Sequence, residues 1–137
     1  MNRKFIISSL VMAFASLMVG FVIHGFFLQN DYARLPNLFR QEASVQNYFG
    51  YMLLAHVFIG IGLTWIYRQG HQAGKGVLVQ GLRFGAAIAV VSTIPMYLIY
   101  FAVQPMPSDL VAQQIVFDSI GMLAMGLLVA WLNKSTG

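Results

Sequence analysis

The sequence predicts an all-α, polytopic membrane protein: a single domain, residues 1–137, folded as a bundle of four transmembrane helices. Hydrophobic residues make up 58% of the chain and charged residues only 9%, whereas soluble domains carry roughly 25% charged residues. Such a chain cannot cover a water-facing surface with polar groups, so its solvent is the lipid bilayer. Four apolar stretches are each near the ~20 residues with which an α-helix crosses a bilayer; they are residues 5–27, 47–67, 77–102 and 111–132.

The first stretch must be distinguished from a cleavable signal peptide, because Arg3 and Lys4 precede an apolar run that contains Ala13 and Ala15. The apolar run continues well past Ala15 to Leu28. Cleavage would leave an apolar remnant without a partner. We therefore interpret this stretch as an uncleaved first span.

The orientation of the spans follows from the lysine and arginine residues of the short loops, which stay on the cytoplasmic side of a membrane. One side of the predicted bundle holds five of these residues, and the other holds only Arg34 and Arg40. The five are Arg3, Lys4, Arg68, Lys75 and Lys134. We therefore expect both termini in the cytoplasm (N-in/C-in).

The linker after the first span, residues 28–46, is long for so small a bundle. Within it Leu35, Leu38 and Phe39 follow one helical face, and Pro36 suits a first helical turn. This pattern predicts a short surface helix in the first outer loop.

Each span also carries small or polar residues at helical spacing. Such residues let helix backbones approach closely, and in lipid this packing replaces the hydrophobic effect. The stripes are Ser16, Gly20 and His24; His56, Gly60 and Thr64; Gly81, Gly85, Ala89 and Ser92; and Asp118, Gly121 and Ala124. We expect them to face the inside of a compact bundle.

From the stripes and the residues beside them we predict an intramembrane polar cluster. Its members are His56, Asp118, Arg83, His24, Ser92 and Thr93. At a rise of ~1.5 Å per residue, His56 and Asp118 both lie about 10–14 Å from the outer ends of their spans. An ionisable residue within a span is by default a candidate functional group, and it needs a polar or charged partner. The partner predicted for Asp118 is His56.

Two structural alternatives accompany this pair. Arg83 can reach towards Asp118 from the cytoplasmic half and neutralise it, which would fix helix register without chemistry. Arg83 can instead extend to the cytoplasmic headgroups, as long basic side chains do near span ends. Pro95, inside the third span, is either a packing kink or a hinge at the depth of the cluster.

Several functional classes are excluded or disfavoured. The chain has no cysteine, which rules out disulfides and thiolate metal sites, and we expect neither a metal site nor nucleic-acid binding. It has no phosphate-binding loop and no recognisable set of catalytic residues, so we expect no enzymatic activity. We expect no cofactor; haem would need two histidines at equal depth, whereas His24 and His56 are offset by roughly 8 Å.

Four short segments together carry a resemblance over most of the chain: HGFF at 24–27, GLRFG at 81–85, QPMP at 104–107 and QIVFD at 114–118. They resemble an uncharacterised family of short bacterial four-span integral membrane proteins. The resemblance implies a multi-pass location in the bacterial inner membrane and no catalytic activity. It places His24, Arg83 and Asp118 inside the matching segments.

The resulting expectation is a non-enzymatic inner-membrane protein. It would act as an accessory or assembly component of a larger membrane complex, or as a self-associating bundle (a homo-oligomer). The alternative is a small proton-coupled transporter that uses an intramembrane pair of His56 and Asp118.

Overall fold

The computed structural model describes residues 2–134, and these residues form helices and turns without any strand. The helical elements are α1 (Arg3–Gly20), the π-helical η1 (Phe21–Phe27), α2 (Gln29–Ala33), α3 (Glu42–Val45), the 3-10 helix η2 (Gln46–Tyr48), α4 (Phe49–Gln69), α5 (Val77–Ile88), the π-helical η3 (Ala89–Thr93), α6 (Ile94–Val103) and α7 (Ser108–Leu132).

Four helices long and apolar enough to cross a membrane confirm the predicted all-helical, four-span class. They are Arg3–Phe27, Ala43–Gln69, Val77–Val103 and Ser108–Leu132. Large apolar side chains lie exposed along all four; Phe14, for example, is 66% exposed. An apolar surface of this extent belongs in lipid, so the chain is a multi-pass membrane protein.

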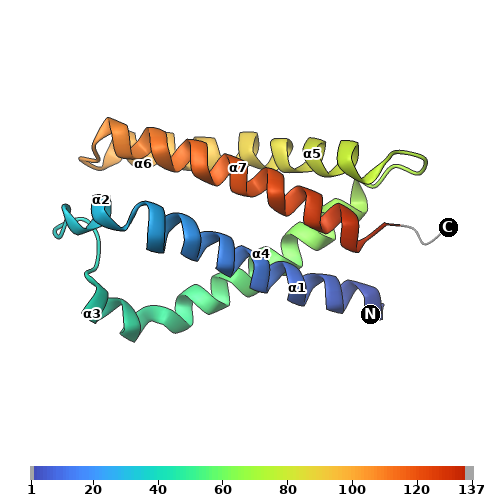
Figure 1. Ribbon diagram of the computed structural model, residues 1–137, viewed down its shortest axis with the longest axis horizontal. Coiled ribbons are helices and arrows are strands. Elements are labelled where there is room, and N and C mark those ends of the chain that lie inside the picture. The colour runs from blue at the N-terminus through green and yellow to red at the C-terminus, as the bar shows by residue number, and fades with distance from the viewer. Residues whose placement is uncertain (1, 135–137) are drawn as a thin grey trace.

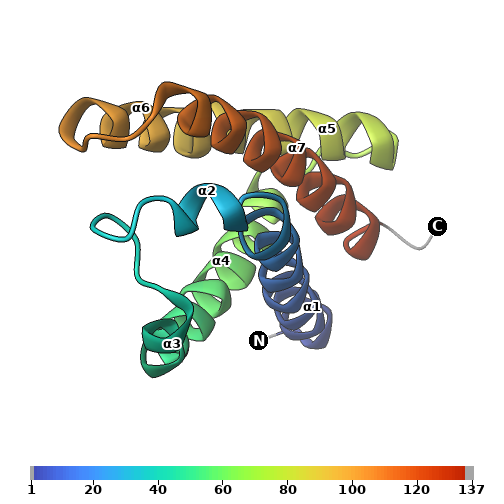
Figure 2. The ribbon, with the colours of Figure 1, turned by 60° about the vertical axis from the view of Figure 1, so that its left-hand side comes forward.

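The helices form two layers (Figure 1). In one layer α5 and α6 lie side by side with α7, and in the other α1 crosses α4. Both ends of the chain and the loop of residues 70–76 lie at one end of the molecule, which we call the terminal end. The opposite end, which we call the linker end, holds residues 28–48 and the turn at 104–107. α1 and α4 lie apart at the linker end, beyond their crossing (Figure 1), and Figure 2 turns this end towards the viewer.

Three glycines hold α5 against α7 with almost no space between the backbones. A Cβ atom built on Gly85 would lie 2.4 Å from the carbonyl oxygen of Met122, and one on Gly126 would lie 2.2 Å from that of Gly81. Gly60 has the same role between α4 and α1, where a Cβ would lie 2.4 Å from the carbonyl oxygen of Ser9. Contact this close is how small residues join helices in lipid.

The small-residue stripes face inward only in part. The members that are buried are Ser16, Gly60, Thr64, Gly81, Gly85, Ala89 and Gly121. Ser92 and Ala124 are exposed, so they do not lie inside the bundle as expected. In the third span the π-helical segment η3 covers Ala89–Thr93, and the wider turn rotates the residues that follow out of the α-helical register.

The interior consists of two clusters. Met12, Leu63, Met125 and Val129 are buried together towards the terminal end. Ile23, Leu28, Tyr97, Met106, Leu110 and Val111 are buried together towards the linker end. Polar groups join the helices beside the first cluster, where Ser8 Oγ lies 3.4 Å from Thr64 Oγ1 and accepts a hydrogen bond of 2.9 Å from Asn133 Nδ2.

The short helix predicted in the first linker was placed wrongly. The helix is α2, which follows the first span almost without interruption, whereas residues 34–39 form turns. Pro36 explains the difference, because the residue before a proline is driven out of the α-helical region. Leu35, Leu38 and Phe39 nevertheless pack against the linker-end cluster.

Pro95 lies in the first turn of α6, directly after η3. The third span is one continuous helix, Val77–Val103, so Pro95 removes a backbone hydrogen bond within it, and prolines and π-helical turns are both recognised causes of helix kinks. The structure thus places a local change of helix geometry where the sequence predicted a kink. A hinge function for Pro95 stays a prediction.

We predict that Gly85→Ala lowers the stability of the folded protein by about 1–3 kcal/mol, because the added methyl group meets backbone atoms that cannot move aside. Gly62→Ala is the matched control, since a Cβ at Gly62 meets nothing within 4 Å. It should leave stability unchanged or raise it by up to about 1 kcal/mol through helix propensity. Unfolding in detergent followed by circular dichroism measures both, and equal stabilities for the two variants would contradict the packing described.

Candidate functional site

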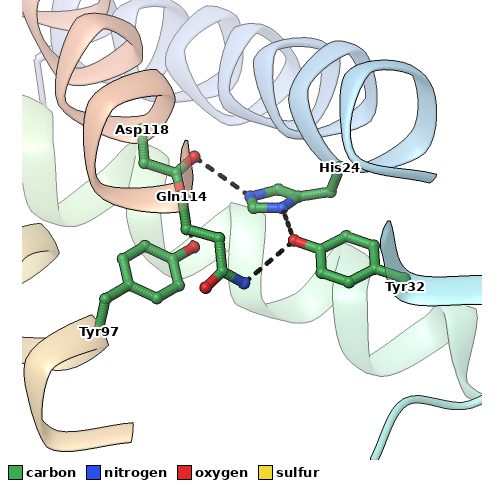
Figure 3. A network of polar contacts seen from close by, with 5 residues as sticks. All are labelled: His24, Tyr32, Tyr97, Gln114 and Asp118. Carbon is green, nitrogen blue, oxygen red and sulfur yellow. Dashed lines mark hydrogen bonds and ion pairs between the residues drawn. The ribbon is translucent and has the colours of Figure 1, made fainter. Parts of the chain in front are cut away.

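Asp118 of α7 lies at the centre of a polar network at the linker end (Figure 3). His24 Nε2, from η1, lies 3.2 Å from Asp118 Oδ1. The hydroxyl of Tyr97, from α6, donates a hydrogen bond to Asp118 Oδ2. The carboxylate therefore has one partner from each of two other spans, and its side chain is only 16% exposed.

The network continues from His24 to the first linker. The hydroxyl of Tyr32, from α2, lies 2.5 Å from His24 Nδ1, and Gln114 Nε2 donates a 3.2 Å hydrogen bond to the same hydroxyl. Tyr32 accepts from Gln114, so its own proton is available for His24 Nδ1. His24 Nε2 then carries the hydrogen that points at Asp118. A neutral imidazole satisfies every one of these contacts.

Local helix geometry positions these side chains. Gln114 and Asp118 are four residues apart in α7 and so lie on one helical face. His24 lies within the π-helical segment η1, and Tyr97 follows the π-helical segment η3 by one turn. π-helical segments are rare and recur at functional sites, and here one lies on each side of Asp118.

A cavity of about 490 Å³ adjoins the network. Its lining combines network members with apolar groups: His24, Tyr32, Leu38, Phe39, Met96, Tyr97, Tyr100, Gln104, Met106 and Gln114. Gln114 is only 3% exposed, and its Oε1 has no hydrogen-bond partner among the described residues. A buried acceptor without a donor is costly; this oxygen is closed off from the cavity, so a donor in the cavity reaches it only when the Gln114 side chain turns.

Tyr32 lies outside the membrane-spanning helices, and its environment perturbs its ionisation. Burial raises the pKa of the Tyr32 hydroxyl to about 12, and the nearby carboxylates of Asp118 and Asp31 act in the same direction. The hydroxyl therefore remains a proton donor to His24 well beyond neutral pH.

The expected contact between His56 and Asp118 is not formed. His56 Nδ1 lies 2.8 Å from Ser16 Oγ of α1, and a Cβ on Gly20 would lie 3.5 Å from His56 Cε1. Because α4 diverges from the α5–α7 layer towards the linker end, His56 meets α1 instead of α7. Residues at one depth in the membrane need not be neighbours, because depth does not determine which helices meet.

Arg83 does not neutralise Asp118 either. Its Nη1 donates a 3.1 Å hydrogen bond to Gln72 Oε1 in the loop of residues 70–76. The side chain therefore lies towards the terminal end, and its extension to the cytoplasmic headgroups stays a prediction. The remaining predicted members are Ser92 and Thr93. Thr93 is buried, whereas Ser92 is exposed. Neither is among the hydrogen-bond partners of Asp118 in the described residues.

Three members of the network were not predicted: Tyr32, Tyr97 and Gln114. Tyr97 was not among the residues predicted for the cluster, and it is buried, with 7% of its surface exposed. Gln114 had a usable signal, because it lies four residues before Asp118 on the same face. Tyr32 had none, since its position depends on how the linker folds back over the span ends.

Within residues 2–134, no three His, Cys, Asp or Glu residues are close enough to hold a metal ion. Both ring nitrogens of His24 are engaged by Tyr32 and Asp118, so neither is free to bind a haem iron in this arrangement.

Comparison with protein families, with curated proteins and with solved structures gives no match to this chain. The resemblance to short bacterial four-span proteins therefore stays a prediction.

We predict that Asp118→Asn lowers the stability of the folded protein by about 1–3 kcal/mol, the cost of leaving a buried donor unpaired. The carboxylate accepts from both His24 and Tyr97, one on each oxygen, whereas an asparagine amide has only one oxygen. One buried donor is then left without an acceptor. Asp109→Asn is the matched control: Asp109 lies exposed in the first turn of the same helix. Its loss should cost no more than about 1 kcal/mol of favourable interaction with the helix dipole. Thermal unfolding in detergent at neutral pH compares the two, and a larger loss for Asp109→Asn would refute the network as a stabilising element.

A second prediction concerns pH. Because the folded protein holds the Tyr32 proton to about pH 12 and an unfolded chain releases it near pH 10, the unfolded state binds fewer protons in that interval. Stability should therefore fall as pH rises from about 10 to about 12, and Tyr32→Phe should reduce this fall. Tyrosinate absorbance can be titrated in the folded wild type and in folded Tyr32→Phe. The difference between the two curves should show a step near pH 12 that belongs to Tyr32, and a step near pH 10 instead would contradict the prediction.

Proposed function

We propose that this protein is a non-enzymatic component of the bacterial inner membrane, which associates with itself or with a larger membrane complex. In this proposal both termini lie in the cytoplasm. The terminal end then faces the cytoplasm, and the linker end, with the polar network, faces outward. The distribution of lysine and arginine supports this orientation.

The observation that carries the proposal is the start of the second span, which comprises η2 and the first two turns of α4. Every residue from 46 to 55 is exposed, which is nearly three helical turns without one covered face. A spanning helix in a bundle ordinarily buries one face against its neighbours. Here the divergence of α1 and α4 leaves the segment apart from the rest of the chain (Figure 2), and an added Cβ at Gly50 would meet nothing within 4 Å.

We predict that this segment meets protein in the native membrane. A photoreactive phenylalanine analogue at Met52 should cross-link to a second copy, or to one protein that co-purifies at fixed stoichiometry. The same analogue at Val90 should label only lipid. Met52 and Val90 are both exposed apolar positions within spans, so they differ in location rather than in chemistry.

The contrary result is equally clear. If neither position cross-links to protein, and the chain purifies from mild detergent as a lone monomer, association is not its function.

A second candidate, a small proton-coupled transporter, is favoured by one observation: an acid–imidazole pair lies beside a cavity at the linker end. The pair in question is His24 and Asp118, in place of the predicted His56 and Asp118. Solute flux driven by a pH gradient in liposomes that contain only this protein, abolished by Asp118→Asn, would favour transport over the assembly role.

A further inference from the structure

We propose that the cavity at the linker end is a binding site for a primary ammonium group attached to an apolar body. The inference rests on the cavity itself and does not require the protein to associate with anything. Three features carry it: an unpaired acceptor, a carboxylate near the cavity with no lysine or arginine in the lining, and aromatic walls.

The acceptor is Gln114. Its amide lies between Tyr32 and Tyr97 (Figure 3). The amide nitrogen donates a hydrogen bond to the hydroxyl of Tyr32, and the buried oxygen has no donor among the described residues. The group that this oxygen requires is an N–H or O–H donor, and a charged donor gives the stronger hydrogen bond.

The charge near the cavity favours a cation. Asp118 lies one helical turn from Gln114 and is the nearest carboxylate of the network, while no lysine or arginine lines the cavity. The two arginines of the linker end are engaged elsewhere. Arg34 pairs with Asp31, and the guanidinium of Arg40 lies 3.7 Å from the centre of the Tyr48 ring.

The walls suit the rest of such a ligand. The rings of Tyr32, Phe39, Tyr97 and Tyr100 line the cavity together with Met96 and Met106. Aromatic faces attract cations, and thioethers and rings accept an apolar body. A volume of about 490 Å³ falls within the usual range of small-ligand sites.

Two sources could present this chemistry: a free organic amine, or the ethanolamine headgroup of a phospholipid. Residues of the linker and of the turn before α7, such as Leu38, Gln104 and Met106, border the cavity. It therefore lies at the ends of the spans, where both sources are within reach.

The test uses the full chain in nanodiscs of phosphatidylcholine and phosphatidylglycerol, with cyclohexylammonium as probe and cyclohexanol as its neutral counterpart. Calorimetric titration should show saturable binding of the ammonium and binding of the alcohol at least about tenfold weaker, because a charged hydrogen bond is lost. Gln114→Leu should weaken ammonium binding by about tenfold or more. Gln113→Leu, the adjacent position that does not line the cavity, should leave it unchanged.

Adding phosphatidylethanolamine to the nanodiscs separates the two sources. If the apparent Kd of the probe rises, the lipid headgroup competes for the cavity; if the Kd is unchanged, a free amine is the ligand class. Equal affinity for the two probes, the absence of saturable binding, or full binding by folded Gln114→Leu would each overturn the proposal. Should Gln114→Leu fail to fold, the comparison of the two probes on the wild-type protein decides.

Discussion

A carboxylate within the apolar part of a membrane span must be paired, and Asp118 sets the arrangement of the linker end for this reason. Its two donors come from different spans, His24 on η1 and Tyr97 on α6. The imidazole in turn is oriented by Tyr32, whose hydroxyl is held by Gln114. One buried charge thereby fixes the positions of two spans and of the linker that folds over them.

The two ends of the molecule are held by different forces. Towards the terminal end, glycines bring backbones into direct contact and a cluster of apolar side chains fills the remaining space. Towards the linker end, α1 and α4 separate, and directional hydrogen bonds join the spans beside a cavity. Polar networks specify geometry sharply when every member is satisfied, and the one unsatisfied atom of this network, Gln114 Oε1, lies at the cavity.

The spans could be predicted from composition and length alone, because crossing a bilayer demands long apolar helices. The largest discrepancy is at the start of the second span, at Ala43 instead of residue 47. Asp118 could be singled out for the same physical reason. Its partners could not, because depth along a helix says nothing about which neighbouring helix a side chain faces.

Two details of the chain explain why the sequence pattern did not identify the inward faces of these helices. His24 lies within the π-helical segment η1, and η3 changes the helical register of the third span just before Tyr97, so positions counted at 3.6 residues per turn no longer identify the inward face there. Pro36 interrupts the helix expected at Leu35–Phe39, and the short helix forms earlier at Gln29–Ala33. Tyr32 enters the network only through this earlier helix.

The backbone contacts among Gly81, Gly85 and Gly126 have a mechanical consequence. Helices packed at such short range cannot slide or tilt past one another without steric overlap, so α5 and α7 form a stiff unit near the terminal end. The cavity is lined instead by η1, the first linker, α6 and the start of α7, so any change in its width must be taken up at the linker end, which makes one end of this small protein rigid and the other compliant.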